Sequence, residues 1–174
     1  MRTTNKGFTL IELLIVVAII GIIAAIAVPG LLRARMSGNE ASAIGSMRAV
    51  NSGQSTYAAS CGSGFYAPSL VSLGTPPTVG GGDGFIGTDL NTDPSVKSSY
   101  TITHTAGALG AGGQASCNGV AAGASVSTYF VGAAPTVGGG VRFFGTNQGG
   151  TIYTSTAAVA VTQNGAPAGA NPLQ

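Results

Sequence analysis

One carboxylate stands alone in a long apolar stretch of this sequence. From Phe8 to Leu32 the chain reads FTLIELLIVVAIIGIIAAIAVPGLL, and Glu12 is its only charged residue. A helix over this stretch would be about 37 Å long, enough to cross a bilayer core of about 30 Å. A lone carboxylate in lipid costs about 2.5–3.5 kcal/mol at mid-membrane and less near the interface. The function of the chain should therefore explain why Glu12 lies there.

Three interpretations of the apolar stretch compete. It could be a cleaved secretory signal, because Ala25-Ile26-Ala27 fits the small-x-small cleavage pattern, although Glu12 and the length of the stretch argue against this. It could be a plain single-span anchor, which leaves Glu12 without a role. It could also be a helix that spans the membrane and later packs against copies of itself. In that case a buried charge that must pair selects one axial offset between neighbouring helices.

Two cysteines, Cys61 and Cys117, lie in the polar remainder of the chain. Basic residues on both sides of the apolar stretch leave its orientation open, so the cysteines and the loop-rich composition lead us to expect export of this part. In an exported domain the two cysteines can form a disulfide, which would stabilise by about 4 kcal/mol in the chain-entropy model. The alternative is a pair of free thiols. A CxxC pair or a Cys/His metal cluster is absent from the sequence.

Few other residues could carry chemistry. His104 is the only histidine, and a lone strand histidine is more often a surface or packing residue than a catalyst. Asp89, Asn91 and Asp93 match the start of a calcium loop, but Pro94 stands where that loop needs glycine. The simpler interpretation is an Asp/Asn-rich turn. We therefore expect no catalytic activity and no cofactor, with calcium at Asp89, Asn91 and Asp93 as the alternative.

Composition limits the partners of the chain. Charged residues make up 7% of the 174 residues, glycine supplies 29 positions, and the net charge is +2. Clustered Lys and Arg, which a nucleic-acid-binding protein would show, are missing, so no nucleic acid is indicated. The length suffices for one modest domain beyond the apolar stretch.

The pattern after Leu32 predicts an α+β domain. An apolar stripe at helical spacing extends the helix over residues 31–59, and one helical turn is expected at 68–73. Segments 99–104, 125–131, 141–146 and 151–154 alternate as strands, the last two forming a hairpin around 147–150. The tail from Ala157 looks mobile. The stripe consists of Leu32, Met36, Ile44, Met47, Val50 and Tyr57.

The segment Gly7-Phe8-Thr9-Leu10-Ile11-Glu12, behind a short basic leader and ahead of an apolar helix, resembles the signature of the type IV pilin and pseudopilin family. The resemblance implies that a prepilin peptidase cuts between Gly7 and Phe8 and methylates the new Phe8 amine. It implies that Glu12 pairs with the Phe8 amine of a neighbouring subunit and sets the register of a filament. It also implies local melting of the helix between Gly21 and Pro29 when the subunit enters the filament, with a simple proline kink as the alternative.

The resemblance also implies an architecture and a role. The expected segments are a cleaved leader (1–7), a transmembrane and filament-core helix (8–32), an amphipathic helix (33–59) and a loop-rich β domain (60–174). The long helix would pack on a sheet of three or four antiparallel strands. We expect a structural subunit that resides in the inner membrane as a precursor and then, through the pilus assembly machinery, forms an extracellular homo-oligomeric filament. A type II secretion pseudopilin in the periplasm, whose relatives bind calcium in this general region, is the second interpretation. A soluble secreted β-rich protein cleaved after Ala27 is the third.

Overall fold

The computed structural model describes residues 7–78 and 80–173, so the basic leader with Arg2 and Lys6 lies outside the described residues. The chain divides into two compact units, an N-terminal unit of residues 1–35 and a C-terminal unit of residues 36–174. Helix α1 (Leu10–Ser60) contributes to both units. The other elements are α2 (Leu70–Gly74), β1 (Ser95–Lys97), β2 (Tyr100–Ala106), β3 (Tyr129–Pro135), β4 (Phe143–Asn147), β5 (Ile152–Ser155) and β6 (Asn171–Pro172).

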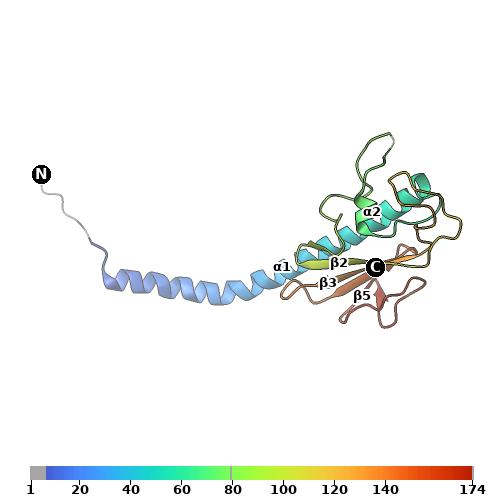
Figure 1. The fold of residues 1–174 in the computed structure, drawn as a ribbon. Coiled ribbons are helices and arrows are strands. Elements are labelled where there is room, and N and C mark those ends of the chain that lie inside the picture. The colour runs from blue at the N-terminus through green and yellow to red at the C-terminus, as the bar shows by residue number, and fades with distance from the viewer. Residues whose placement is uncertain (1–6, 79, 174) are drawn as a thin grey trace, which may run out of the picture. The chain divides into compact units, whose positions relative to one another are not determined.

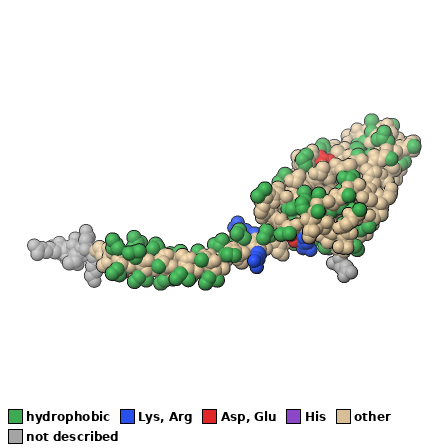
Figure 2. Space-filling view, turned by 90° about the horizontal axis from the view of Figure 1, so that it is seen from below, with side chains coloured by type: hydrophobic (Ala, Val, Ile, Leu, Met, Phe, Trp, Pro, Cys, Tyr) green, Lys and Arg blue, Asp and Glu red, His purple; other side chains and the backbone are tan. Residues whose placement is uncertain are grey.

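The N-terminal unit is an apolar helix with no core of its own. Every described residue from Gly7 to Arg35 is exposed, and hydrophobic side chains cover this helix (Figure 2). The helix is long and apolar enough to cross a membrane, with a mean hydropathy of 3.1 over its most apolar window. It continues through Gly21 and Pro29, although Pro29 has no N–H to donate to the helix. Melting between Gly21 and Pro29 was expected in a filament, and it stays a prediction.

In the C-terminal unit the remainder of α1 buries one face against a sheet (Figure 1). The buried positions recur every three or four residues, as the helical period requires. Met47, Val50 and Tyr57 were expected there and are fully buried. Leu32 was also expected in this stripe, but it is 54% exposed, and the face begins instead at the charged Glu40. The buried face of α1 consists of Glu40, Ala43, Ser46, Met47, Val50, Gly53, Gln54 and Tyr57.

The sheet is an antiparallel meander of six strands in the order β1-β2-β3-β4-β5-β6. Each strand pairs with its neighbour in the sequence, for example Ile102 of β2 with Ala133 of β3. The α+β class, the antiparallel sheet and the short helix after Pro68 agree with the sequence prediction, while the expected three or four strands are too few. Strand β3 begins at Tyr129 and not at Ser125, because Val126 instead forms isolated bridges with Tyr66 and Leu109.

The end of the chain corrects the expectation of a mobile tail. Strand β6 pairs with β5, and the Leu173 N–H donates to the carbonyl of Ile152 at 2.7 Å. The side chain of Asn147 donates to the carbonyls of Thr162 and Gly165 at 3.0 and 2.9 Å. These backbone contacts give the tail a fixed path that its Ala- and Gly-rich sequence does not signal.

Candidate functional site

The first turn of α1 places Glu12 in a capping box. The side-chain oxygen of Thr9 accepts from the N–H of Glu12 at 3.2 Å, and the Thr9 N–H donates back to the Glu12 carboxylate at 2.9 Å. The Thr9 hydroxyl also donates to the same carboxylate oxygen, at 2.7 Å. This reciprocal arrangement satisfies N–H groups that a helix start otherwise leaves unpaired. The T-x-x-E pattern of Thr9 and Glu12 is present in the sequence, and it is the local signal of this cap.

The capping box fixes the position of one charged group on an exposed apolar helix. Both hydrogen bonds that the carboxylate accepts from Thr9 end on the same oxygen, Oε2. The third contact joins the Glu12 N–H to the Thr9 hydroxyl oxygen. The other oxygen, Oε1, accepts no hydrogen bond from residues 7–78 or 80–173, and it can therefore receive a cation from outside the chain. An ammonium group is such a cation.

The peptide bond between Gly7 and Phe8 lies just before the helix. Residues 7–9 have no regular secondary structure, and Phe8 is 79% exposed. A protease needs an extended, accessible backbone around the bond that it cuts, and exposed chain ends outside regular structure provide one. The geometry of Gly7 and Phe8 is therefore compatible with the cut that we expect there.

Comparisons with known proteins point to the same segment. Residues 2–28 match the model of the prokaryotic N-terminal methylation motif. This segment is therefore similar to the N-terminal segment of type IV pilins. The chain is similar to the type IV major pilin protein PilA of Myxococcus xanthus, with 45% identity over 53 residues, which are 30% of this chain and 24% of the relative.

Two further pilins show the same local likeness. The type IV wide pilus major component PilA4 of Thermus thermophilus is 66% identical over 35 residues, or 20% of this chain and 27% of the relative. The type IV major fimbrial protein FimA of Dichelobacter nodosus is 76% identical over 29 residues, or 17% and 19%. The matched part thus spans only about a quarter or less of the length of these pilins. No solved structure shows a significant match to the chain.

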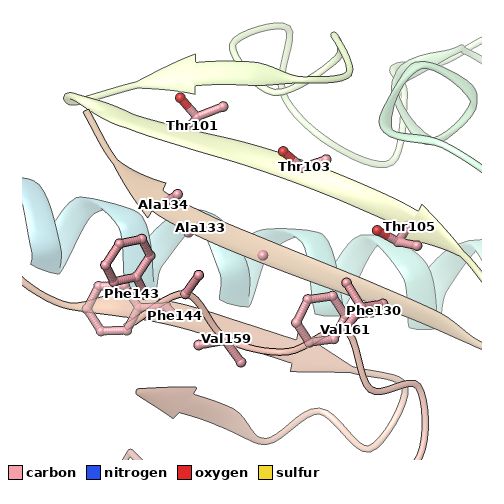
Figure 3. Close-up of a pocket in the computed structure, with 12 residues that line it drawn as sticks. Thr101, Thr103, Thr105, Phe130, Ala133, Ala134, Phe143, Phe144, Val159 and Val161 are labelled. Atoms are coloured by element: carbon pink, nitrogen blue, oxygen red, sulfur yellow. The ribbon is translucent and has the colours of Figure 1, made fainter. Parts of the chain in front are cut away.

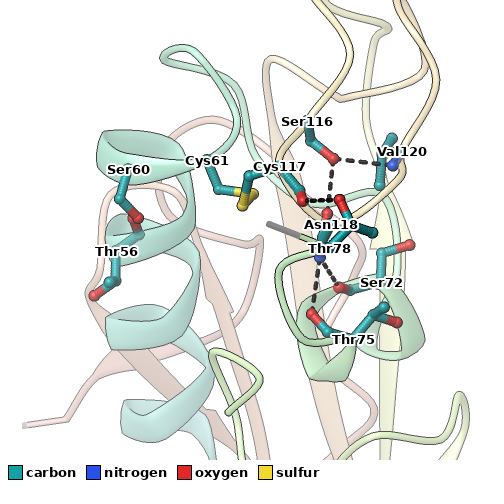
Figure 4. The surroundings of a disulfide bond; sticks show 10 residues. All are labelled: Thr56, Ser60, Cys61, Ser72, Thr75, Thr78, Ser116, Cys117, Asn118 and Val120. Atoms are coloured by element: carbon teal, nitrogen blue, oxygen red, sulfur yellow. Dashed lines mark hydrogen bonds between the residues drawn. A yellow bond between two sulfur atoms is a disulfide. The ribbon is translucent and has the colours of Figure 1, made fainter. Parts of the chain in front are cut away.

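The two cysteines are bonded, as the sequence allowed. Cys61 and Cys117 form a disulfide, with their Cα atoms 4.9 Å apart (Figure 4). The Cys117 N–H also donates to the carbonyl of Cys61 at 3.3 Å. Because Cys61 directly follows the last residue of α1, the bond ties the end of the long helix to the loop between β2 and β3.

Asn118 extends this attachment to α2. Its side-chain amide donates to the carbonyls of Ser72 and Thr75 at 2.6 and 3.1 Å, at the C-terminal end of α2 (Figure 4). Its side-chain oxygen accepts from the hydroxyl of Ser116 at 2.7 Å. The Ser72 carbonyl also accepts from the Thr75 N–H at 3.2 Å, so Asn118 adds a second donor at Ser72 and supplies one to the Thr75 carbonyl just after the helix. Nothing in the sequence next to Cys117 indicated this role.

The calcium candidates lie in contacts within the chain. Asp89 forms an ion pair with Lys97, and the hydrogen bond from Lys97 keeps the pKa of the Asp89 carboxyl below its usual value. Asp93 accepts from the N–H of His104 at 3.1 Å. The side chain of Asn91 packs beside Gly74. Within the described ranges, no group of three or more His, Cys, Asp or Glu side chains could hold a metal ion.

His104 is buried in the core beneath α1. Its Nε2 atom lies 3.2 Å from the side-chain nitrogen of Gln54, and its ring stacks on Tyr129. Burial lowers the pKa of the imidazole, and the charge of Asp93 opposes this only in part. A neutral ring with Nε2 as acceptor fits the donor that Gln54 presents. These contacts give His104 the packing role that the sequence favoured.

The sheet face away from α1 carries a shallow apolar groove of about 170 Å³ (Figure 3). Thr101, Thr103 and Thr105 of β2 lie along one side, and Val159 and Val161 of the tail lie on the other (Figure 3). Val159 would block a Cβ atom at Gly145, so the tail packs directly on the sheet there. The groove lining contains no charged residue.

Proposed function

We propose that this chain is a structural subunit of a type IV pilus-like filament, without catalytic activity of its own. One observation carries the proposal. The N-terminal methylation motif, with Glu12 five residues after Gly7, begins an apolar helical segment in which every described residue up to Arg35 is exposed. Exposure of so much apolar surface to water is unfavourable, so lipid or other helices must cover this segment.

The proposed assembly has two stages. The precursor resides in the inner membrane through residues 8–32, and a prepilin peptidase cuts between Gly7 and Phe8. The freed and methylated Phe8 amine of one subunit then meets Glu12 of another. In the apolar surroundings of a helix bundle, that ion pair would be favourable at only one axial offset.

The relatives support a filament over a secretion pseudopilus. PilA, PilA4 and FimA carry the names of major pilins or major fimbrial proteins. For the C-terminal unit they support a pilin role only by analogy, because their likeness to this chain is confined to its N-terminal part. We infer from them a surface location for the assembled subunit and an inner-membrane location for its precursor.

The filament subunit that we propose uses no cofactor. The carboxylates of Asp89 and Asp93 have partners within the chain, which supports a structural turn over a calcium site. The same thermal midpoint for the C-terminal unit in calcium and in a chelator would agree with this proposal. A clear rise in that midpoint with calcium would favour the pseudopilin.

The intact mass and N-terminal sequence of the mature chain test the proposal directly. Material sheared from the cell surface should begin at Phe8 and carry one additional methyl group. A chain that begins at Val28 would be an ordinary secreted domain, and the filament proposal would fall. A chain that begins at Phe8 but occurs only in the periplasm would identify a pseudopilin.

A further inference from the structure

The loop between β3 and β4, residues 136–142, exposes two valines. Val137 is 107% exposed relative to a reference residue, and Val141 is 61% exposed. We propose that this β3–β4 loop rests on the surface of the bilayer while the subunit is anchored there, and so holds the C-terminal unit in a defined orientation before assembly. The inference depends on the membrane-anchored precursor of the proposed function.

The loop has a fixed shape. The Gly139 N–H donates to the carbonyl of Thr136 at 2.8 Å and closes a turn in which Val137 is the second residue. The Thr136 N–H donates to the carbonyl of Ser99 at 2.9 Å. Gly138 has a φ of +76°, a conformation that favours glycine. A Cβ atom at Gly139 would clash with the Ser99 carbonyl oxygen. A preformed turn loses little conformational entropy on contact, so a weak attraction suffices.

Contacts hold the loop at the start of the C-terminal unit. The side chain of Asn39 donates to the carbonyl of Gly139 at 2.9 Å, and the carboxylate of Glu40 accepts from the Val141 N–H at 3.0 Å. Leu32 ends the apolar stretch seven residues before Asn39. Seven residues span at most about 25 Å even when fully extended. In any arrangement of the two units, Asn39 and its loop contact therefore stay close to the point where the chain leaves the bilayer.

The charges at this end of the unit suit an anionic lipid surface. Glu40 is neutralised by Arg142, whose Nε donates to its carboxylate at 2.8 Å. Arg33 and Arg35 follow the apolar stretch directly and are exposed. Basic residues close to a membrane are attracted to anionic lipids. The valines then enter the interface without an unpaired carboxylate beside them.

A bilayer is the occupant that we favour over a second copy of the chain. Each anchored subunit keeps its loop within reach of its own membrane, so the contact is intramolecular in effect and needs little affinity. Burial of a valine side chain is favourable, and partial burial at an interface contributes less than complete burial. A second copy would have to meet the loop by diffusion within the membrane.

A single tryptophan can report this contact, because the chain contains none. The full chain with Val137→Trp would be reconstituted at high lipid excess into vesicles of phosphatidylethanolamine and phosphatidylglycerol, with or without brominated acyl chains. Val71→Trp is the matched control, since Val71 is also exposed, at 52%, and lies on α2. Helix α2 packs on Gly53, which is about 21 Å further along α1 than Asn39.

A contact worth about 1.4 kcal/mol would give roughly ten bound loops for each free one. We therefore expect brominated lipid to remove half or more of the V137W emission and to leave V71W unchanged. Equal quenching of the two variants would overturn the proposal. A V137W signal that changes only as the protein-to-lipid ratio rises would assign the loop to a second copy and would also overturn it. A chain that does not float with the vesicles would contradict the membrane-anchored precursor itself.

Discussion

Glu12 has two separable roles at the scale of a single residue. In the isolated chain it caps its own helix through Thr9, and in a filament we expect it to receive the Phe8 amine of a neighbour. The capping role uses Oε2, and the pairing role can use Oε1. A substitution at Glu12 removes both roles, whereas a substitution at Thr9 removes only the capping contacts of its hydroxyl.

We predict that Glu12→Val leaves the protein in the membrane but reduces sheared fibre to background. An amine left without a counter-charge in apolar surroundings costs about 3–5 kcal/mol. Thr9→Val is the control, because loss of a helix cap costs only about 1 kcal/mol and leaves the carboxylate in place. Near-normal fibre yield from Glu12→Val, measured by immunoblot of sheared and membrane fractions, would rule out the register role of Glu12.

His104 should make the stability of the C-terminal unit depend on pH. Burial lowers the pKa of its imidazole below the ordinary value of 6.5, so the unfolded chain binds the proton more readily than the folded one. The free energy of unfolding should therefore fall as the pH drops below about 6.5. Denaturant unfolding at pH 7, 6 and 5 measures this slope. His104→Gln keeps an acceptor for Gln54, and we expect it to flatten the slope; an unchanged slope would assign the dependence to another group.

The carboxylate of Glu40 should make stability depend on pH in a lower range. Burial alone would raise the pKa of Glu40, but hydrogen bonds from the Val141 N–H and from Arg142 outweigh it, and the pKa lies below 4.5. Its contribution is therefore complete above about pH 4.5 and is lost as the pH falls further. The two groups act in separate pH ranges, so the slope between pH 7 and 5 reports mainly on His104.

At the scale of elements, the disulfide fastens the last turn of α1 to the loop before β3. We predict that Cys61→Ser lowers the free energy of unfolding by about 4 kcal/mol, because the loop between the two cysteines is long. Cys117→Ser in the same chain should cause little further loss, since the bond is already absent. Thermal unfolding of the single and double variants measures both effects. Two alkylatable thiols in non-reduced protein from native fibres would refute the bond.

The long elements were predictable from sequence, and the contacts between distant segments were not. Helix α1 followed from an apolar run and an apolar stripe, and β2 followed from alternating β-branched residues. Strands β1 and β6 contain only three and two residues, too few for a periodic pattern. Their pairing comes from backbone groups of neighbouring strands, which composition does not encode.

The buried polar residues of α1 show the same limit. Glu40 lies on the buried face of α1 with Arg142 as its partner, and Arg142 is 102 residues further along the chain. Gln54 is buried because its amide donates to the carbonyl of Ala67 and accepts from the Ala67 N–H. A polar residue on a buried helix face is stable only with such partners, and a sequence does not reveal partners that folding brings together. The capping box of Thr9 and Glu12, in contrast, is local and could have been predicted.

At the scale of the whole molecule, the two units differ in whether they bury their own apolar side chains. The described part of the N-terminal unit buries no side chain, and the core of the C-terminal unit begins at Glu40. We predict that a chain lacking residues 1–35 is soluble without detergent and unfolds cooperatively at the thermal midpoint of the full chain. Calorimetry of the two chains, the longer one in detergent micelles, measures this. A broad transition or a much lower midpoint in the shorter chain would show that the apolar helix contributes to the core.

The meander of the sheet also bears on how the domain is made. Each strand pairs with the one that precedes it in the sequence, so pairing can advance strand by strand from the N-terminal side of the sheet. Three of the five pairs of neighbouring strands are joined by seven residues or fewer, whereas 22 residues separate β2 from β3 and 15 separate β5 from β6, so these two pairings need longer loop closures. Cys117 precedes β3 in the sequence, so the covalent link to α1 can form before the later strands have paired. Strand β6, formed by Asn171 and Pro172, adds to the sheet after β5, with which it pairs.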